Sequence, residues 1–212
     1  MAGRVEMSSS EETQRFRIGL GVDASDGRCG KLTRVIIDPV AQSLTHLVIT
    51  PPHHKELARL VSVDFVEAVE SDTIRLRCTK QEFDQLDVAV DVQFLAADTD
   101  PMPFHATDTA HSAGSGRPER IYSDRIPVGE VEIRRGDAVH AKDGWVGAVQ
   151  GLVIDPSDNR VTHLLLQEGH LWGRKQVAIP IGSAARIGDE VRVDLTKEEI
   201  GKLQAVRLGS GH

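Results

Sequence analysis

Residues 143–170 of this chain read DGWVGAVQGLVIDPSDNRVTHLLLQEGH, and residues 26–53 read DGRCGKLTRVIIDPVAQSLTHLVITPPH. The two stretches lie 117 residues apart and share ten identical residues in 28 positions, including the groups DG, DP and THL. Further along, TKQE at 79–82 stands at the same offset from TKEE at 196–199. A repeat of this length indicates two copies of one domain rather than a solenoid of short units.

Each copy contains short apolar segments separated by turn signals, a pattern typical of an all-β barrel or sandwich. The Asp-Pro groups predict tight loops, because Pro presets φ for a turn and the Asp carboxylate can cap nearby amides. A T-x-x-E capping box predicts a short helix after Thr79 and another after Thr196. In the second copy we expect strands over 138–141, 146–154, 161–167, 176–181 and 190–195.

The segments 44–50 and 161–167 carry apolar side chains on both faces of the expected strand. Such strands are covered on both sides. One side faces the interior of a barrel, and we expect the other to meet the terminal helix, the sister domain or a partner chain.

The repeat and the composition divide the chain into four parts. We expect a disordered tail over 1–14, a first domain over 15–97, a flexible linker over 98–120 and a second domain over 121–208. The linker is rich in Thr, Ser, Gly, Pro and Ala and has no apolar period. We expect each domain to fold around its own core.

The composition restricts the classes of partner. The net charge is −7, and the only aromatic residues are 5 Phe, 2 Trp and 1 Tyr. An acidic chain with few rings does not favour direct nucleic-acid binding, which uses Lys and Arg for phosphates and rings for bases. We find no signal peptide and no apolar run of transmembrane length, so we expect a cytoplasmic protein. Cys29 and Cys78 are expected to be buried thiols, with a reactive Cys29 as the alternative.

The second copy resembles the PRC-barrel family. Residues 143–180, DGWVGAVQGLVIDPSDNRVTHLLLQEGHLWGRKQVAIP, and LTKEEI at 195–200 carry the resemblance. The first copy keeps the first half of the pattern but departs from it at PPHHKELARLVSVDF, residues 51–65. The tandem layout is similar to that of a group of bacterial proteins, and the resemblance covers about residues 17–90 and 121–205.

The resemblance implies a mainly β fold of two small PRC-like β-barrels in tandem, each closed by a short C-terminal helix. Such barrels are similar to the cytoplasmic domain of the photosynthetic reaction-centre H subunit and to the C-terminal domain of the ribosome-maturation factor RimM. Both of those domains dock on other macromolecules, although their roles are unrelated. The family has no catalytic motif to carry over, so we expect no enzyme and no cofactor.

The candidate interaction residues are two Trp and three His. Trp145 follows the Asp143-Gly144 turn, and Trp172 lies in a loop between Gly169 and Gly173. Each ring is either tucked over the edge of its barrel or presented as an interface anchor, since Trp is enriched at binding hot spots. His46 and His163 recur in register, as do His53 and His170. A metal site needs three or four converging donors, so we expect a structural or surface role for these His. The candidates are therefore Trp172, His170, His163, Trp145 and His46.

The predicted function is a protein-protein interaction or scaffolding module. The two barrels are expected to pack on each other or to form a homodimer, as self-complementary surfaces do. Two alternatives stay open at this point: a ribosome- or RNA-processing-associated factor, suggested by the resemblance, and a small-ligand binding protein.

Overall fold

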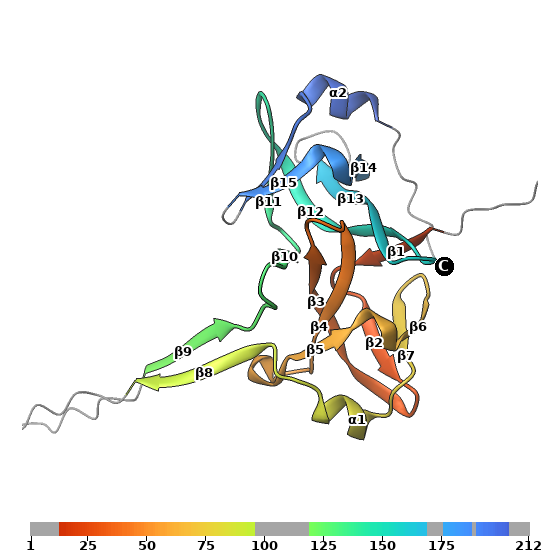
Figure 1. Ribbon diagram of the computed structural model, residues 1–212, viewed down its shortest axis with the longest axis vertical. Helices are drawn as coiled ribbons and strands as arrows, with labels where there is room; N and C mark the ends of the chain where they lie inside the picture. Colours follow the sequence, from red (N-terminus) through yellow and green to blue (C-terminus); the bar gives the residue numbers. More distant parts are fainter. Residues whose placement is uncertain (1–12, 96–118, 169–175, 188–189, 204–212) are drawn as a thin grey trace, which may run out of the picture.

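The computed structural model describes residues 13–95, 119–168, 176–187 and 190–203 (Figure 1). The chain is mainly β, with 14 strands in one sheet and a separate two-stranded ribbon of β8 and β9. In chain order the strands and α-helices are β1 Gln14–Arg17, β2 Gly21–Ala24, β3 Gly27–Asp38, β4 Ser43–Thr50, β5 Arg59–Ser62, β6 Val66–Val69, β7 Thr73–Leu76, α1 Lys80–Gln85, β8 Val90–Leu95, β9 Glu119–Asp124, β10 Val131–Arg134, β11 Ala138–Ala141, β12 Gly144–Asp155, β13 Arg160–Glu168, β14 Gln176–Pro180, β15 Ala184–Ile187, β16 Glu190–Val193 and α2 Lys197–Lys202.

The element order of the first half returns in the second half. The run from β2 to α1 and the run from β11 to α2 each contain six strands, a 3-10 turn after the fourth strand and a final short helix. The first run has one additional 3-10 turn, Lys55–Leu57, between β4 and β5. The first residue of β3 lies 117 positions before the first residue of β12, and the last residue of β3 lies 117 positions before the last residue of β12. The strands and loops expected in the second half are confirmed, with small shifts of their ends.

The hairpins form where the Asp-Pro groups predict them. Asp38 Oδ1 accepts hydrogen bonds from the amides of Val40 at 2.7 Å and Ala41 at 3.0 Å. Asp155 Oδ1 accepts a hydrogen bond from the hydroxyl of Ser157 at 2.7 Å and another from its amide at 2.9 Å, and these bonds lower the pKa of this carboxyl. The carboxylates thus fix the turns that return β4 and β13 along the long strands.

Both capping boxes are present at the N-termini of α1 and α2. Thr79 accepts from the Glu82 amide and Thr196 accepts from the Glu199 amide, while each Glu reaches back to the Thr amide. Each helix also buries one large side chain, Phe83 or Ile200, at 1% exposure. The two helices lie at opposite ends of the molecule (Figure 1).

The DG turns of the repeat hold these helices. Asp26 Oδ1 accepts from the Lys80 amide at 2.8 Å, and Asp143 Oδ1 accepts from the Lys197 amide at 2.9 Å. Each carboxylate therefore satisfies one of the unpaired amides that begin a helix. This contact explains why the DG and TK groups recur together at the same offset.

The two halves exchange one strand each. Strand β1 pairs with β12 of the second half, and β10 pairs with β3 of the first half, both antiparallel. The registers correspond, since Phe16 faces Leu152 and Ile133 faces Val35, each residue 117 positions from its counterpart. Each half's part of the common sheet therefore includes a strand from the other half.

The separate interiors expected for the two domains are not found. One cluster of buried hydrophobic side chains runs through both halves, from Phe16, Leu32 and Leu47 to Leu152 and Val191. The exchange of β1 and β10 carries apolar side chains across the junction, so the cores merge. The expectation of two independent cores was wrong.

The expected closure into barrels is also not found. The strand order is an open path from β15 through β16, β11, β12, β13, β4, β3, β2 and β7 to β6. After β5 and after β14 the chain turns through a 3-10 segment, and the following strand pairs only with β7 or β16. The helices cover part of the shared core rather than the end of a closed barrel.

The second apolar face of β4 is covered by the chain that follows α1. Val48 forms a small cluster with Ile36, Ala58 and Ala89, each at 1% exposure or less. The Ala89 amide donates to the Ala58 carbonyl at 2.8 Å, which holds this segment in place. Within the described residues, this face of β4 is thus covered by the chain's own segments around Ala58 and Ala89.

Candidate interaction surface

Four residues form a row across the outer face of the second half. Ala185 on β15 faces Arg192 on β16, Arg192 faces His140 on β11, and His140 faces Trp145 on β12. Their chain neighbours Val139 and Val191 point into the shared core. Because side chains alternate along a strand, the row itself points outward.

The Trp145 side chain is the most unusual member of this row. It is 40% exposed, although most large apolar side chains of the described residues are buried. It follows the Asp143-Gly144 turn, where β12 begins. An indole on a rigid strand loses little conformational freedom on binding and offers a large contact area, which suits an interface anchor.

Polar and charged side chains of β11, β16 and the residues that follow these two strands form ion pairs beside this row. His140 Nε2 lies 3.7 Å from Glu190 Oε1, and Arg192 Nη2 lies 3.9 Å from Glu190 Oε2. Lys142 Nζ contacts Asp194 Oδ1 at 2.7 Å, and this hydrogen bond raises the pKa of the lysine. The arrangement is an apolar centre with a mixed-charge rim, as protein interfaces have.

The same row in the first half has a different chemistry. There Ala68 faces Arg75, Arg75 faces Asp23, and Asp23 faces Arg28. Arg28 Nε lies 3.6 Å from Asp23 Oδ1. The first half therefore carries a charged pair where the second half carries an imidazole and an indole.

Sequence reasoning found Trp145 but missed His140 and Arg192. Alternation along 190–195 places Arg192 on a polar face, but it does not say which strand lies beside it. The parallel pairing of β11 with β16 makes His140 and Arg192 neighbours. Their separation of 52 positions hides the pair from local pattern analysis.

The other candidate residues lie elsewhere. His46 and His163 occupy matching positions on β4 and β13. His46 Nδ1 lies 3.5 Å from Glu130 Oε2, and His163 Nδ1 lies 3.0 Å from Thr162 Oγ1. Trp172 and His170 lie outside the described residues, so their predicted role stays a prediction.

The two thiols are buried, as the sequence predicts. Cys29 is 8% exposed and Cys78 is 4% exposed. Burial, the nearby Cys78 and the nearby Asp23 raise the pKa of Cys29 to about 11. A thiol with such a raised pKa is a poor nucleophile, which argues against the alternative of a reactive Cys29.

Two further properties concern the described residues alone. Within them, no group of three or more His, Cys, Asp or Glu side chains is placed to hold a metal ion. None of the helices in this part of the chain has the length and apolarity needed to span a bilayer.

The comparisons with known proteins now identify the class of the second half. Residues 132–200 match the PRC-barrel domain family, so the chain contains one PRC-barrel domain, which runs from β10 to α2. The Trp145 row lies inside this domain. No curated protein matches the chain.

Proposed function

We propose that this chain is a non-catalytic docking module whose first half is a second, diverged PRC-barrel domain. The matching element order, the constant offset of 117 residues and the corresponding registers of β1 and β10 support a duplication. The PRC family match covers only the second half. The first half has diverged most at residues 51–65, where β5 follows a 3-10 turn, Lys55–Leu57.

The observation that carries the docking proposal is the exposed Trp145 on its row. A protein partner with an apolar pocket would bury the indole, and its polar groups would meet the charged rim around Glu190 and Lys142. Burial of a Trp side chain at the centre of an interface typically contributes more than about 2 kcal/mol to binding. The partner is proposed to be a protein in the same compartment, and we place that compartment in the cytoplasm.

Site-specific photo-crosslinking in the native host tests this proposal. A photoreactive amino acid at position 145 should give a discrete crosslinked partner, identified by mass spectrometry. The same amino acid at position 28, the matching position of the first half, is the control. Equal crosslinking from both positions, or none from position 145, would contradict the proposal.

A quantitative measurement then follows with the identified partner. Trp145→Ala should weaken binding at least tenfold in a titration, whereas Arg28→Ala should leave it unchanged. Both substitutions lie at exposed positions, so both variants should keep the circular dichroism spectrum of the parent. Retained affinity in Trp145→Ala would show that the indole is not the anchor.

A further inference from the structure

We infer that the cavity at the junction of the two halves binds a small oxyanion that also carries hydroxyl groups, such as a sugar phosphate or a hydroxy acid. The cavity has a volume of about 420 Å³, within the range of small-ligand sites. Its polar lining consists of Arg17, Asp72, Arg135, Gln150, Gln167 and Gln176.

Both halves contribute to this cavity. Arg17 ends β1, and Asp72 lies in the turn between β6 and β7. Arg135 follows β10, while the three Gln side chains come from β12, β13 and β14. Because β1 is paired with β12, the strand exchange itself brings the two arginines and the three amides together.

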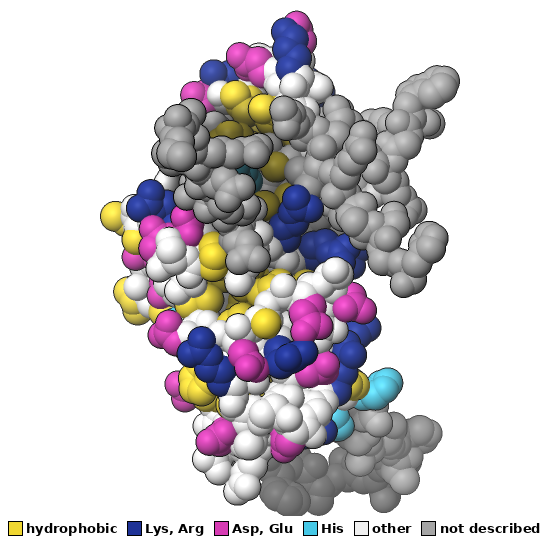
Figure 2. Space-filling view, turned by 90° about the vertical axis from the view of Figure 1, so that its right-hand side faces the viewer, with side chains coloured by type: hydrophobic (Ala, Val, Ile, Leu, Met, Phe, Trp, Pro, Cys, Tyr) yellow, Lys and Arg dark blue, Asp and Glu magenta, His cyan; other side chains and the backbone are white. Residues whose placement is uncertain are grey.

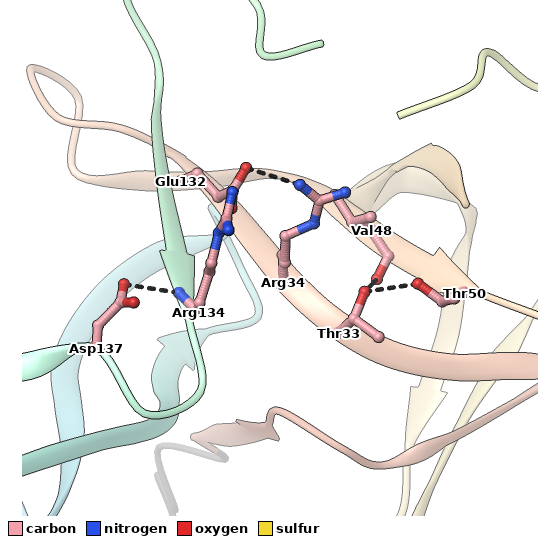
Figure 3. Close-up of polar contacts among 7 residues, drawn as sticks. All are labelled: Thr33, Arg34, Val48, Thr50, Glu132, Arg134 and Asp137. Carbon is pink, nitrogen blue, oxygen red and sulfur yellow. Dashed lines mark hydrogen bonds and ion pairs between the residues drawn. The ribbon is translucent and has the colours of Figure 1, made fainter. Parts of the chain in front are cut away.

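The duplicated fold supplies an internal comparison for the site. The counterparts of Gln150 and Gln167, 117 residues earlier, are Thr33 and Thr50. Thr33 Oγ1 lies 2.8 Å from Thr50 Oγ1 and donates to the Val48 carbonyl at 3.1 Å (Figure 3). The polar groups at that position satisfy each other.

The matching part of the sheet around β3 also holds an ion pair between Arg34 and the exchanged strand β10. Arg34 Nη1 contacts Glu132 Oε2 at 3.1 Å, and the Arg134 guanidinium contacts the same carboxylate (Figure 3). In the second half the counterpart of Arg34 is Gly151, and the counterpart of Glu132 is Arg15. With Gly151 and Arg15 in these places, the matching ion pair cannot form around β12. Gly151 faces Arg17, which lines the cavity.

Several polar side chains of the cavity lack such internal partners. Gln176 Oε1 is buried without a hydrogen-bond partner. In the described part of the chain, the side chains of Gln150, Gln167 and Arg135 also show no hydrogen bond or ion pair. Buried polar groups normally find partners, so the unpaired Gln176 Oε1 is suited to a polar ligand. Gln150 and Gln167 are half-buried and Arg135 is exposed, so all three side chains are accessible to such a ligand.

The charge of the cavity selects the ligand class. Arg17 and Arg135 give two positive charges, and Asp72 gives one negative charge. On the face shown in Figure 2, Lys and Arg side chains gather at the level where the halves meet. A guanidinium binds phosphate and carboxylate in a two-pronged geometry. The carboxamides and Asp72 can accept hydrogen bonds from hydroxyl groups, and the carboxamides can also donate.

Calorimetric titration of the full chain tests the inference. Glucose 6-phosphate, citrate, inorganic phosphate and glucose are compared at low ionic strength. Saturable binding of glucose 6-phosphate or citrate, tighter than that of phosphate and of glucose, is the expected result. Tighter binding of glucose 6-phosphate than of citrate would indicate a phosphate ligand, and the reverse order would indicate a carboxylate ligand. The absence of saturable binding for all four ligands would overturn the inference.

Two variants and one control locate the binding. Arg135→Gln should weaken the affinity at least tenfold, and Gln176→Leu should weaken it for the hydroxylated ligands more than for phosphate. Arg75→Gln removes the same charge from an exposed position outside the cavity and should leave binding unchanged. Equal effects of Arg135→Gln and Arg75→Gln would show a general charge effect and would reject the site. The outcome does not depend on the Trp145 surface, because neither cavity variant lies in that row.

Discussion

Ser43 on β4 and Arg160 on β13 face each other across the junction of the two halves, and each is the counterpart of the other in the repeat. The backbone bonds around them are reciprocal. The Leu44 amide donates to the backbone carbonyl of Asn159 at 2.9 Å, and the Val161 amide donates to the backbone carbonyl of Gln42 at 2.8 Å. The junction therefore has the self-complementary form of an isologous dimer interface, contained in one chain.

The exchanged strand β1 should be essential for the stability of the whole molecule. Phe16 is fully buried in the shared core, so Phe16→Ala should lower the free energy of unfolding by about 3–5 kcal/mol. Chemical denaturation followed by circular dichroism measures this. The matching substitution Ile133→Ala in β10 should also be strongly destabilising. A change as small as that of the exposed control Val40→Ala would contradict a shared core.

Gly151 should be required for the docking of β1. A Cβ atom at this position would lie 2.1 Å from the Phe16 carbonyl oxygen, and the strand would have to move. Gly151→Ala should therefore cost about 1–3 kcal/mol. A Cβ atom at Gly182 would meet nothing within 4 Å, so Gly182→Ala is the matched control. Thermal unfolding that shows equal midpoints for the two variants would contradict the close approach.

The Glu132 carboxylate should be a strong structural contact. It is 4% exposed and contacts the guanidiniums of Arg34 and Arg134. Removal of one member of a buried ion pair typically costs about 3–5 kcal/mol, so Glu132→Gln should destabilise the chain by that order. In a double-mutant cycle, Arg34→Met with Glu132→Leu should cost less than the sum of the single changes. Additive effects would show that the pair does not interact.

The Cys29 thiol should react slowly in the native protein. Because burial holds its pKa at about 11, only about one thiol in a thousand is ionised at pH 8. Alkylation followed by mass spectrometry should therefore label Cys29 far more slowly in buffer than in denaturant. A native rate close to the denatured rate would contradict the burial of this thiol.

The capping boxes should make stability depend on pH in the acid range. The pKa values of Glu82 and Glu199 are lowered, first by the hydrogen bonds from the amides of Thr79 and Thr196 and then by those from their hydroxyls. On acidification the unfolded state binds protons first, so this stabilisation is present above pH about 4.5 and is lost as pH falls through the lowered pKa. Urea unfolding at neutral and acid pH measures the loss.

A paired substitution separates this effect from general acid denaturation. The double variant Glu82→Gln with Glu199→Gln should lose less stability on acidification than the parent. Glu67→Gln, at an exposed strand position, is the control and should behave as the parent. Identical pH profiles of the double variant and the parent would show that the two carboxylates do not contribute.

Local patterns in the sequence predicted much of each half. The Asp-Pro loops, the helices at Thr79 and Thr196, and the buried strands around Leu47 and Leu164 are all present in the structure. These features depend on contacts between residues a few positions apart, and such contacts leave a regular spacing in the sequence. Of the candidate site, Trp145 was found in this way because an aromatic side chain after a DG turn is visible locally.

By itself, the sequence determined the internal similarity at an offset of 117 residues, the positions of both helices and of many strands, and which side chains avoid water. Only the tertiary structure decided that β1 pairs with β12, that Glu132 lies between Arg34 and Arg134, and that His140 and Arg192 stand beside Trp145. The physical reason lies in the nature of β-pairing. Alternation states which face of a strand is buried, but any strand edge offers the same backbone groups to many partners. The choice among those partners is made when distant segments pack, and here that choice joined the two halves of the chain around a single core.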